Sequence, residues 1–242
     1  MRSLWGLSCL AAAVIFLGLA LPAEAVPITF TGSQGDLAAS ASFDINGSNQ
    51  LVVTLTNTSI HDVLVPSDVL TALFFDIDGD PVLTRISATL APGSVVIHGT
   101  TDPGGVVGGE WAYKAGLSGA PGGTSQGISS SGFDLFGPGD RFPGNDLDSP
   151  ASPDGMNYGI LSAGDNTATG NSPILSRPFI KNGVVFVLGG LPGGFSLSDI
   201  HNVWWQYGTD LSEPHFPEPT TILLLASSAV ILGLRGVARR KV

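Results

Sequence analysis

The sequence has almost no cysteine and little positive charge. Cys9 is the only cysteine among 242 residues, and it lies in an apolar stretch near the N-terminus. The chain beyond that stretch therefore has no disulfides, thiolate metal sites or cysteine nucleophiles. Only 10 Lys and Arg stand against 20 Asp and Glu, so no basic surface is available to neutralise phosphates. Nucleic acid is excluded as a partner.

Charged residues of either sign are also scarce, at 12% of the chain, whereas Gly and Pro number 33 and 17. A helical bundle or coiled coil requires long runs of charged and strongly helix-forming residues, and this composition excludes one.

The first 25 residues have the order of a secretory signal. Arg2 is followed by an apolar stretch at 4–21 and by an A-x-A site that ends at Ala25. We expect export by the Sec machinery and cleavage by signal peptidase between Ala25 and Val26. An uncleaved membrane anchor is the alternative, because eighteen apolar residues are nearly long enough to span a bilayer.

A second apolar run lies at the other end, at 220–234, and a basic cluster follows it. Fifteen residues make roughly 22 Å of helix, which is short for a hydrocarbon core of about 30 Å. Snorkelling of Arg235 extends the predicted transmembrane helix to about residue 238. The positive charges place the C-terminus inside and residues 26–216 outside; a buried core helix is the alternative. The basic residues are Arg235, Arg239, Arg240 and Lys241.

Immediately before this run stand Pro217, Glu218 and Pro219. A P-E-P triplet alone is only a rigid extended segment. Followed by a short apolar helix and a basic tail, it makes residues 217–242 resemble the PEP-CTERM sorting signal of Gram-negative bacteria. The resemblance implies recognition by an exosortase, a transient anchor in the inner membrane, removal of the tail, and delivery to the cell surface or extracellular matrix.

The segment between the two ends, residues 26–216, is strongly acidic. It has eighteen acidic and five basic residues, a net charge of −13. Such a surface repels anionic polymers and collects divalent cations weakly. About 190 residues are enough for one domain with a substantial core.

The apolar pattern of this segment is that of an all-β protein. Short alternating or β-branched runs recur every eight to twelve residues and are separated by turn signals such as N-G-S and D-G-D-P. This spacing predicts an antiparallel β-sandwich or jelly roll. The predicted strands are 39–45, 51–57, 69–76, 82–90, 94–98, 110–115, 184–188 and 203–207.

One region interrupts the series. Gly and Pro supply 25 of the 75 residues at 99–173, and 116–156 forms a connection far longer than ordinary loops. Either it contains short strands that the pattern does not reveal, or it is a mobile surface insert. We expect one domain with this long insert.

Four segments of the domain resemble a family of exosortase-dependent surface proteins of unknown activity. The resemblance implies no catalytic residues. The segments are 74–84, 108–113, 127–135 and 201–209.

Asp76, Asp78 and Asp80 are the strongest candidate for a metal site, because three carboxylates at alternate positions can direct oxygens at one Ca²⁺ ion. The spacing of Gly79 and Pro81 does not fit an EF-hand, and an acidic hairpin turn is the simpler interpretation. A second acidic set in the insert favours a solvated loop, with weak ordering by calcium as its alternative; its members are Asp134, Asp140, Asp146, Asp148 and Asp154.

The motif G-T-S-Q-G around Ser125 fits the expression for a nucleophile elbow. The strand and helix that an elbow requires are not predicted on either side of it. The four histidines lack zinc-ligand spacing. We therefore expect no enzyme.

Tryptophans offer a binding alternative. Trp204 and Trp205, with Trp111 on another strand, would stack on sugar rings if they shared an exposed sheet face. Adjacent strand residues point to opposite faces of a sheet. At most one of Trp204 and Trp205 can therefore share an exposed, sugar-binding face with Trp111. The sequence thus predicts an exported surface or matrix protein with a structural or adhesive role, and a calcium-assisted carbohydrate-binding module that contacts extracellular polysaccharide as the alternative.

Overall fold

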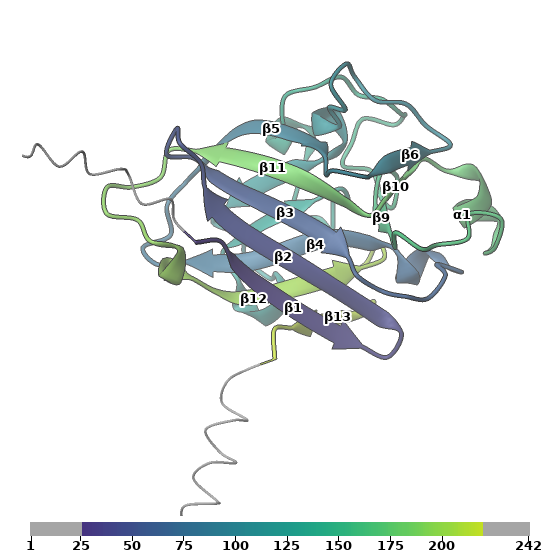
Figure 1. Ribbon diagram of the computed structural model, residues 1–242, viewed down its shortest axis with the longest axis horizontal. Coiled ribbons are helices and arrows are strands. Elements are labelled where there is room, and N and C mark those ends of the chain that lie inside the picture. Colours follow the sequence, from purple (N-terminus) through teal and green to yellow (C-terminus); the bar gives the residue numbers. More distant parts are fainter. Residues whose placement is uncertain (1–25, 220–242) are drawn as a thin grey trace, which may run out of the picture.

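The structure is a computed structural model that describes residues 26–219 (Figure 1). The predicted signal segment up to Ala25 and the predicted membrane helix and basic tail at 220–242 lie outside these residues. Between residues 26 and 219 no helix is long and apolar enough to cross a membrane. The described helices are all short: α1 (Ser172–Ser176) and the 3-10 turns η1 (Pro66–Asp68), η2 (Gly108–Glu110), η3 (Pro121–Gly123), η4 (Pro138–Asp140) and η5 (Leu197–Asp199).

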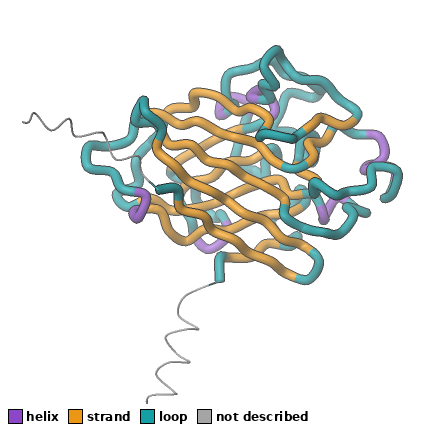
Figure 2. The backbone as a smooth tube through the Cα atoms, in the orientation of Figure 1, coloured by secondary structure: helices purple, strands orange, loops and turns teal. Residues whose placement is uncertain are grey.

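Strands and loops account for nearly all of the described chain, which confirms the all-β class (Figure 2). One sheet has five antiparallel strands in the order β1-β2-β3-β11-β5. Its strands are β1 (Ile28–Gln34), β2 (Leu37–Ile45), β3 (Leu51–Asn57), β11 (Gly183–Gly189) and β5 (Thr84–Leu90).

The second sheet has eight strands in the order β13-β12-β4-β9-β10-β6, with β8 paired to β4 and β7 paired to β8. Its strands are β13 (His215–Pro217), β12 (Ile200–Tyr207), β4 (Leu70–Ile77), β9 (Ile160–Leu161), β10 (Phe179–Lys181), β6 (Val95–Ile97), β8 (Gln126–Ser129) and β7 (Ala112–Ala115).

The prediction of purely antiparallel sheets is wrong at one place, because β9 and β10 pair in parallel. Parallel neighbours cannot be joined by a hairpin and need a crossover connection. Residues 162–178, which include α1, supply that connection.

The two sheets pack face to face around one large core. Phe43 of β2 lies edge-on against Phe75 of β4, with ring centroids 5.4 Å apart, and Trp111 lies 5.1 Å from Phe186 of β11. The strand predicted at 51–57 coincides with β3, in which every second residue from Leu51 is buried. Figure 1 shows the five-stranded sheet as the front layer in this view.

The outer face of the eight-stranded sheet is covered by the long insert. Seven of the eight residues of β4 are buried, because odd-numbered Leu73 and Phe75 face the main core while Phe74 faces a second cluster. That cluster contains Phe136 from the insert. A strand buried on both faces is apolar almost throughout, which explains the continuous run at 69–76. The insert also contains β8, so of the two alternatives raised for 116–156, the short hidden strand is the one observed.

Candidate functional site

The acidic turn after β4 forms one side of a pocket of about 330 Å³. The turn brings Asp76, Asp78 and Asp80 to the same pocket as Ser125 and His201, from three separate segments of the chain. Sequence reasoning named the three aspartates and Ser125, and treated His201 only as one of the four histidines, but did not foresee that they share one site. No local pattern links residue 76 to residues 125 and 201, because the contact is created by strand pairing.

Asp76 acts as the connecting residue of this pocket. Its Oδ1 accepts hydrogen bonds from the backbone N–H of Ser125 at 2.7 Å and from the Ser125 hydroxyl at 3.1 Å. Its Oδ2 accepts one from the Asn202 side chain at 2.7 Å. One carboxylate thereby joins β4 to the residue before β8 and to β12, which stabilises the sheet at this end.

The three carboxylates do not converge on a common point. Asp80 accepts a hydrogen bond from Ser125, while Asp78 is exposed and lies 3.7 Å from the His201 ring. Within the described range 26–219, no group of three or more His, Cys, Asp or Glu side chains is arranged to hold a metal ion. The turn is thus organised by hydrogen bonds to Ser125 and Asn202.

Ser125 does not have the geometry of a nucleophile elbow. It precedes β8 instead of following a strand, and its hydroxyl contacts Asp76 and Asp80. The His201 ring nitrogen Nδ1 lies 3.1 Å from the backbone oxygen of Asp199. A serine nucleophile needs a base that takes its proton and free N–H groups for the oxyanion, and the Ser125 N–H is already bonded to Asp76.

The tryptophans do not form an exposed sugar-binding face, and this prediction is wrong for two of the three. Trp111 and Trp205 are completely buried between the sheets. Trp204 lies on the opposite face of β12, as the strand period requires, and is partly exposed. Its indole N–H donates to Asn202 at 2.9 Å, and its ring packs 5.8 Å from His215. The insert covers it, since Gly122 lies directly against the indole nitrogen.

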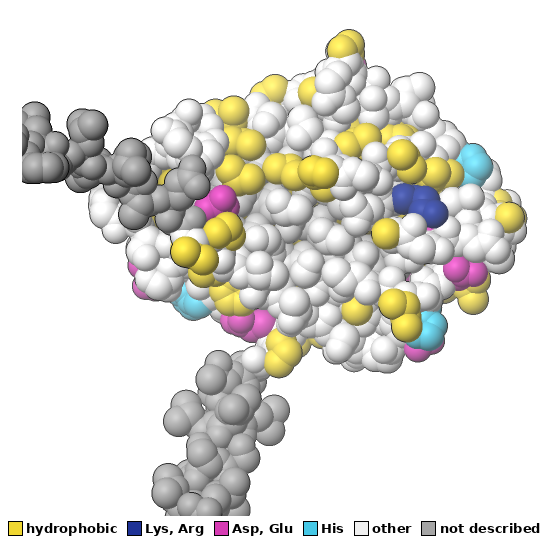
Figure 3. Space-filling model, viewed as in Figure 1, with side chains coloured by type: hydrophobic (Ala, Val, Ile, Leu, Met, Phe, Trp, Pro, Cys, Tyr) yellow, Lys and Arg dark blue, Asp and Glu magenta, His cyan; other side chains and the backbone are white. Residues whose placement is uncertain are grey.

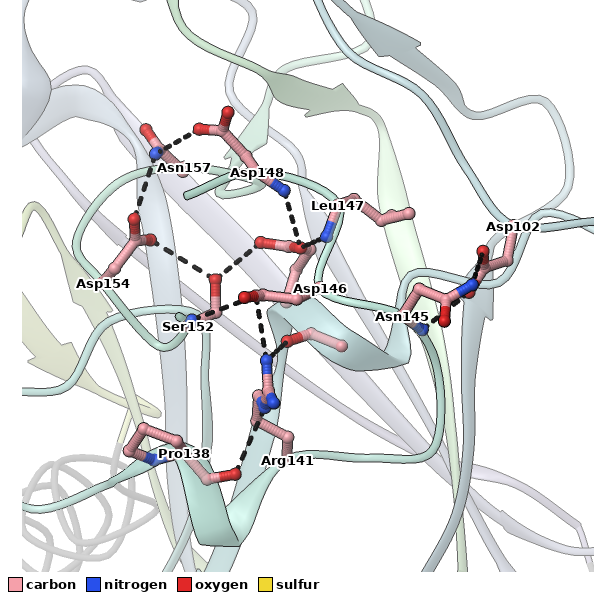
Figure 4. A network of polar contacts seen from close by, with 12 residues as sticks. Asp102, Pro138, Arg141, Asn145, Asp146, Leu147, Asp148, Ser152, Asp154 and Asn157 are labelled. Carbon is pink, nitrogen blue, oxygen red and sulfur yellow. Dashed lines mark hydrogen bonds and ion pairs between the residues drawn. The ribbon is translucent and has the colours of Figure 1, made fainter. Parts of the chain in front are cut away.

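A network that sequence reasoning missed surrounds the buried carboxylate of Glu110. Figure 4 shows its partners Leu147, Asp148 and Ser152. Its Oε1 accepts hydrogen bonds from the backbone N–H groups of Leu147 and Asp148, and its Oε2 accepts one from the Ser152 hydroxyl at 2.6 Å. Burial raises the pKa of Glu110 above its ordinary value; the three hydrogen bonds oppose the rise and the charge of Asp146 adds to it.

Three members of the second acidic set, Asp146, Asp148 and Asp154, belong to this network. Asp134 is exposed, as expected for a solvated loop, and Asp140 forms ion pairs with Arg85 at 3.8 Å and with Lys114 at 3.7 Å. Arg141 forms an ion pair with Asp146 at 2.9 Å, and Asn157 donates to Asp148 at 2.8 Å and to Asp154 at 3.3 Å. Burial, and then the neighbouring charge of Asp148, raise the pKa of Asp154. Figure 4 shows these side chains converging on the loop at 145–157, which the network orders.

The residues of the expected sorting motif stand at the edge of the eight-stranded sheet. Pro217 is the last residue of β13 and pairs opposite Trp204 of β12. Glu218 follows it and is half-buried, while Pro219 is exposed. The motif therefore begins inside the folded domain.

No protein-family model, no curated protein and no solved structure matches this chain.

Proposed function

We propose that this chain is an exported surface or extracellular-matrix protein with a structural or adhesive role, processed by an exosortase while its C-terminal helix holds it at the inner membrane. The order of segments in the sequence supports the proposal: an export signal, an acidic domain without cysteine, the P-E-P triplet, an apolar run and a basic tail. We assign the two packed sheets of the domain to the β-sandwich class with jelly-roll character.

The observation that supports an adhesive role best is the outer face of the five-stranded sheet. Side chains on this face are hydroxylic or aliphatic, with a single carboxylate, although the domain as a whole carries a net charge of −13. Figure 3 shows white and yellow atoms over its centre, and charged atoms towards its margin. The outward residues are Thr29, Thr31 and Ser33; Ala38, Ser40, Ser42 and Asp44; Val52, Thr54 and Thr56; Val185 and Val187; and Ser87 and Thr89.

These side chains form regular rows across the strands. In one complete row each residue is the direct partner of the next, and neighbouring strands lie about 4.8 Å apart. Most members are β-branched and hold few rotamers, so little side-chain entropy is lost when the face is covered. The row runs Thr29, Ser42, Thr54, Val185 and Thr89.

A face with one carboxylate and few flexible side chains suits an uncharged, regular partner. Neutral polysaccharide presents hydroxyl groups and C–H groups side by side, as threonine does with its hydroxyl and methyl. Anionic polymers are disfavoured because the rest of the domain repels them. We therefore propose neutral polysaccharide of the matrix as the partner of this face.

The adhesive role is tested with the full-length chain on an array of neutral and anionic polysaccharides. We expect binding to neutral members, and a loss of about tenfold in affinity for Thr54→Lys, which buries a charge at the centre of the face. Ser118→Lys is the matched control, because Ser118 is exposed in the insert on the far side of the second sheet. Equal binding by both variants, or binding to no neutral polysaccharide, would refute the role of this face.

The sorting step is tested separately, by deletion of residues 217–242 and fractionation of the cells. We expect full-length chain to pass from the membrane fraction to the surface with a loss of mass beyond signal removal, and the truncated chain to bypass the membrane stage. If both forms occupy the same compartments with the mass expected from signal removal alone, the proposed processing is wrong.

A further inference from the structure

Strand β13 (His215–Pro217) joins the expected sorting motif to the fold. Its three residues pair in antiparallel register with β12: His215 with Gln206, Phe216 with Trp205, and Pro217 with Trp204. It is the outermost strand of the eight-stranded sheet. The first residue of the motif is thus a sheet residue.

The pairing continues into the motif beyond the strand. The Glu218 backbone N–H donates to the carbonyl oxygen of Val203 at 2.9 Å. Burial raises the pKa of the Glu218 carboxyl, and the nearby backbone N–H groups of Val203 and Asn202 oppose the rise. The backbone of the motif glutamate is therefore bound by β12, and its carboxyl group lies beside that strand.

One aromatic side chain anchors this strand. Phe216 is 5% exposed and packs against the rings of Trp205 and Tyr207, with centroids 5.9 and 5.7 Å away. Gly32 of β1 makes the room for this cluster, since a methyl group there would stand 3.0 Å from the Phe216 ring. Residues on both sides of β13 in sequence are exposed or half-buried, so Phe216 supplies most of the apolar burial of the strand.

This arrangement conflicts with recognition of the motif by an enzyme in the membrane. Enzymes that act on a peptide segment bind its extended backbone and neighbouring side chains, and here β12 already occupies those groups of Pro217 and Glu218. The chain from Pro217 to the start of the apolar run at 220 spans at most about 11 Å. A docked motif would therefore press the whole domain against the membrane surface where the enzyme must bind.

We propose that β13 is an autoinhibitory strap: the folded domain withholds its own sorting motif, and processing requires β13 to separate from β12. The inference rests on the proposed function, because it concerns access to the motif by the exosortase. Separation is a local event. A three-residue edge strand, one of whose residues is a proline without an N–H, opens far more readily than the domain unfolds.

Two conservative variants of the full-length chain separate local opening from global unfolding. Phe216→Leu removes the aromatic anchor of β13, whereas Phe186→Leu removes another buried ring, which packs on Trp111 and Phe142, away from β13. In a pulse-chase in bacteria that contain an exosortase, we expect Phe216→Leu to be processed several-fold faster than wild type and Phe186→Leu to match wild type. Equal acceleration by both, or none by Phe216→Leu, would overturn the strap.

A reversible lock tests the same step in the opposite direction. Cysteines in place of the directly paired Gln206 and His215 would bridge β12 to β13, and Cys9 is the only other cysteine of the sequence. In membranes that contain the enzyme, we expect the oxidised form to resist processing and the reduced form of the same variant to be processed. Equal rates, with the disulfide verified by mass, would also overturn the strap.

Failure of the proposed function has a different signature. If wild type, Phe216→Leu and the reduced cysteine variant all keep their mass in membranes with the enzyme, as in membranes without it, the sorting proposal itself is refuted. If only the variants with a released β13 are processed, the sorting proposal and the strap are both supported.

Discussion

Gly32 of β1 lies directly against the buried ring of Trp205 of β12, so that the backbone of one sheet contacts a side chain of the other. A Cβ atom at residue 32 would stand 2.5 Å from Cζ3 of Trp205 and 3.0 Å from the Phe216 ring. Replacement by alanine forces these buried rings to shift. We expect Gly32→Ala to lower the free energy of unfolding by about 1–3 kcal/mol, measured by urea denaturation of the full-length chain in detergent.

Gly47→Ala is the matched control for this substitution. Gly47 lies in the turn between β2 and β3, where no atom stands within 4 Å of the new methyl group. We expect a change within about 0.5 kcal/mol. If Gly32→Ala changed the free energy of unfolding as little as Gly47→Ala does, the close packing of β1 on β12 would be contradicted.

Glu110 predicts a pH dependence of stability. Because the pKa of Glu110 is raised in the folded state, the folded chain keeps a proton that the unfolded chain releases as pH rises above the ordinary value of 4.5. The contribution of this group is therefore complete below pH 4.5 and is lost as pH rises through the folded pKa. Glu110→Gln keeps the shape of the side chain and does not titrate.

We therefore compare the free energies of unfolding of Glu110→Gln and wild type at two pH values. The value for Glu110→Gln minus that for wild type should increase from about pH 4 to about pH 7, by about 1.4 kcal/mol for each unit of the pKa rise. Urea denaturation at the two pH values measures this difference. Asp154 shifts in the same direction but remains in both proteins, so it cancels. A difference that does not depend on pH would show that the surroundings of Glu110 do not favour its protonated form.

The hydrogen bonds of Asp76 predict a large effect for a small chemical change. In Asp76→Asn an amide nitrogen replaces one of the two oxygens, so either Ser125 or Asn202 faces a donor instead of an acceptor. We expect a loss of about 2 kcal/mol in the free energy of unfolding. Asp78→Asn, at an exposed carboxylate of the same turn, should change it by less than about 0.5 kcal/mol. Equal effects at residues 76 and 78 would mean that the turn is held by charge alone.

The part of the fold predicted from sequence is the part built from short runs of β-branched and other apolar residues. The run at 51–57 coincides with β3, and the run at 184–188 lies within β11, because such residues fit a pleated sheet that has one face in the core. β13 shows no such signal, since three residues are too few for a period and one aromatic anchor holds the strand.

The sequence identified several residues of the candidate sites, but it did not predict which of them the fold brings together. Asp76, Ser125 and Asn202 come together across 49 and 126 positions of sequence, which only the pairing of β4 with β8 and β12 brings about. The opposite orientation of Trp204 and Trp205 followed from the strand period, whereas the burial of Trp205 depends on the facing sheet. Glu110 gave no signal, because its partners are backbone N–H groups of a distant loop.

The insert makes a further prediction, because its order depends on a close approach to β4. Gly127 of β8 lies against Phe74, and a methyl group at residue 127 would stand 2.7 Å from that ring and 3.0 Å from Phe136. Lys114 and Arg141, near the two ends of the covering segment, are sites for trypsin, and Lys114 is held by a hydrogen bond to the Leu135 carbonyl at 2.7 Å. Slow cleavage at both sites is expected in the full-length wild-type chain, because a protease needs a locally unfolded segment.

Gly127→Ala should speed cleavage at Lys114 by about tenfold, because overpacking lifts the insert from the sheet. Gly139→Ala, with no atom near its added methyl group, should be cleaved at the wild-type rate. Rapid cleavage at Lys114 in wild type would instead favour the mobile insert that the sequence also allowed.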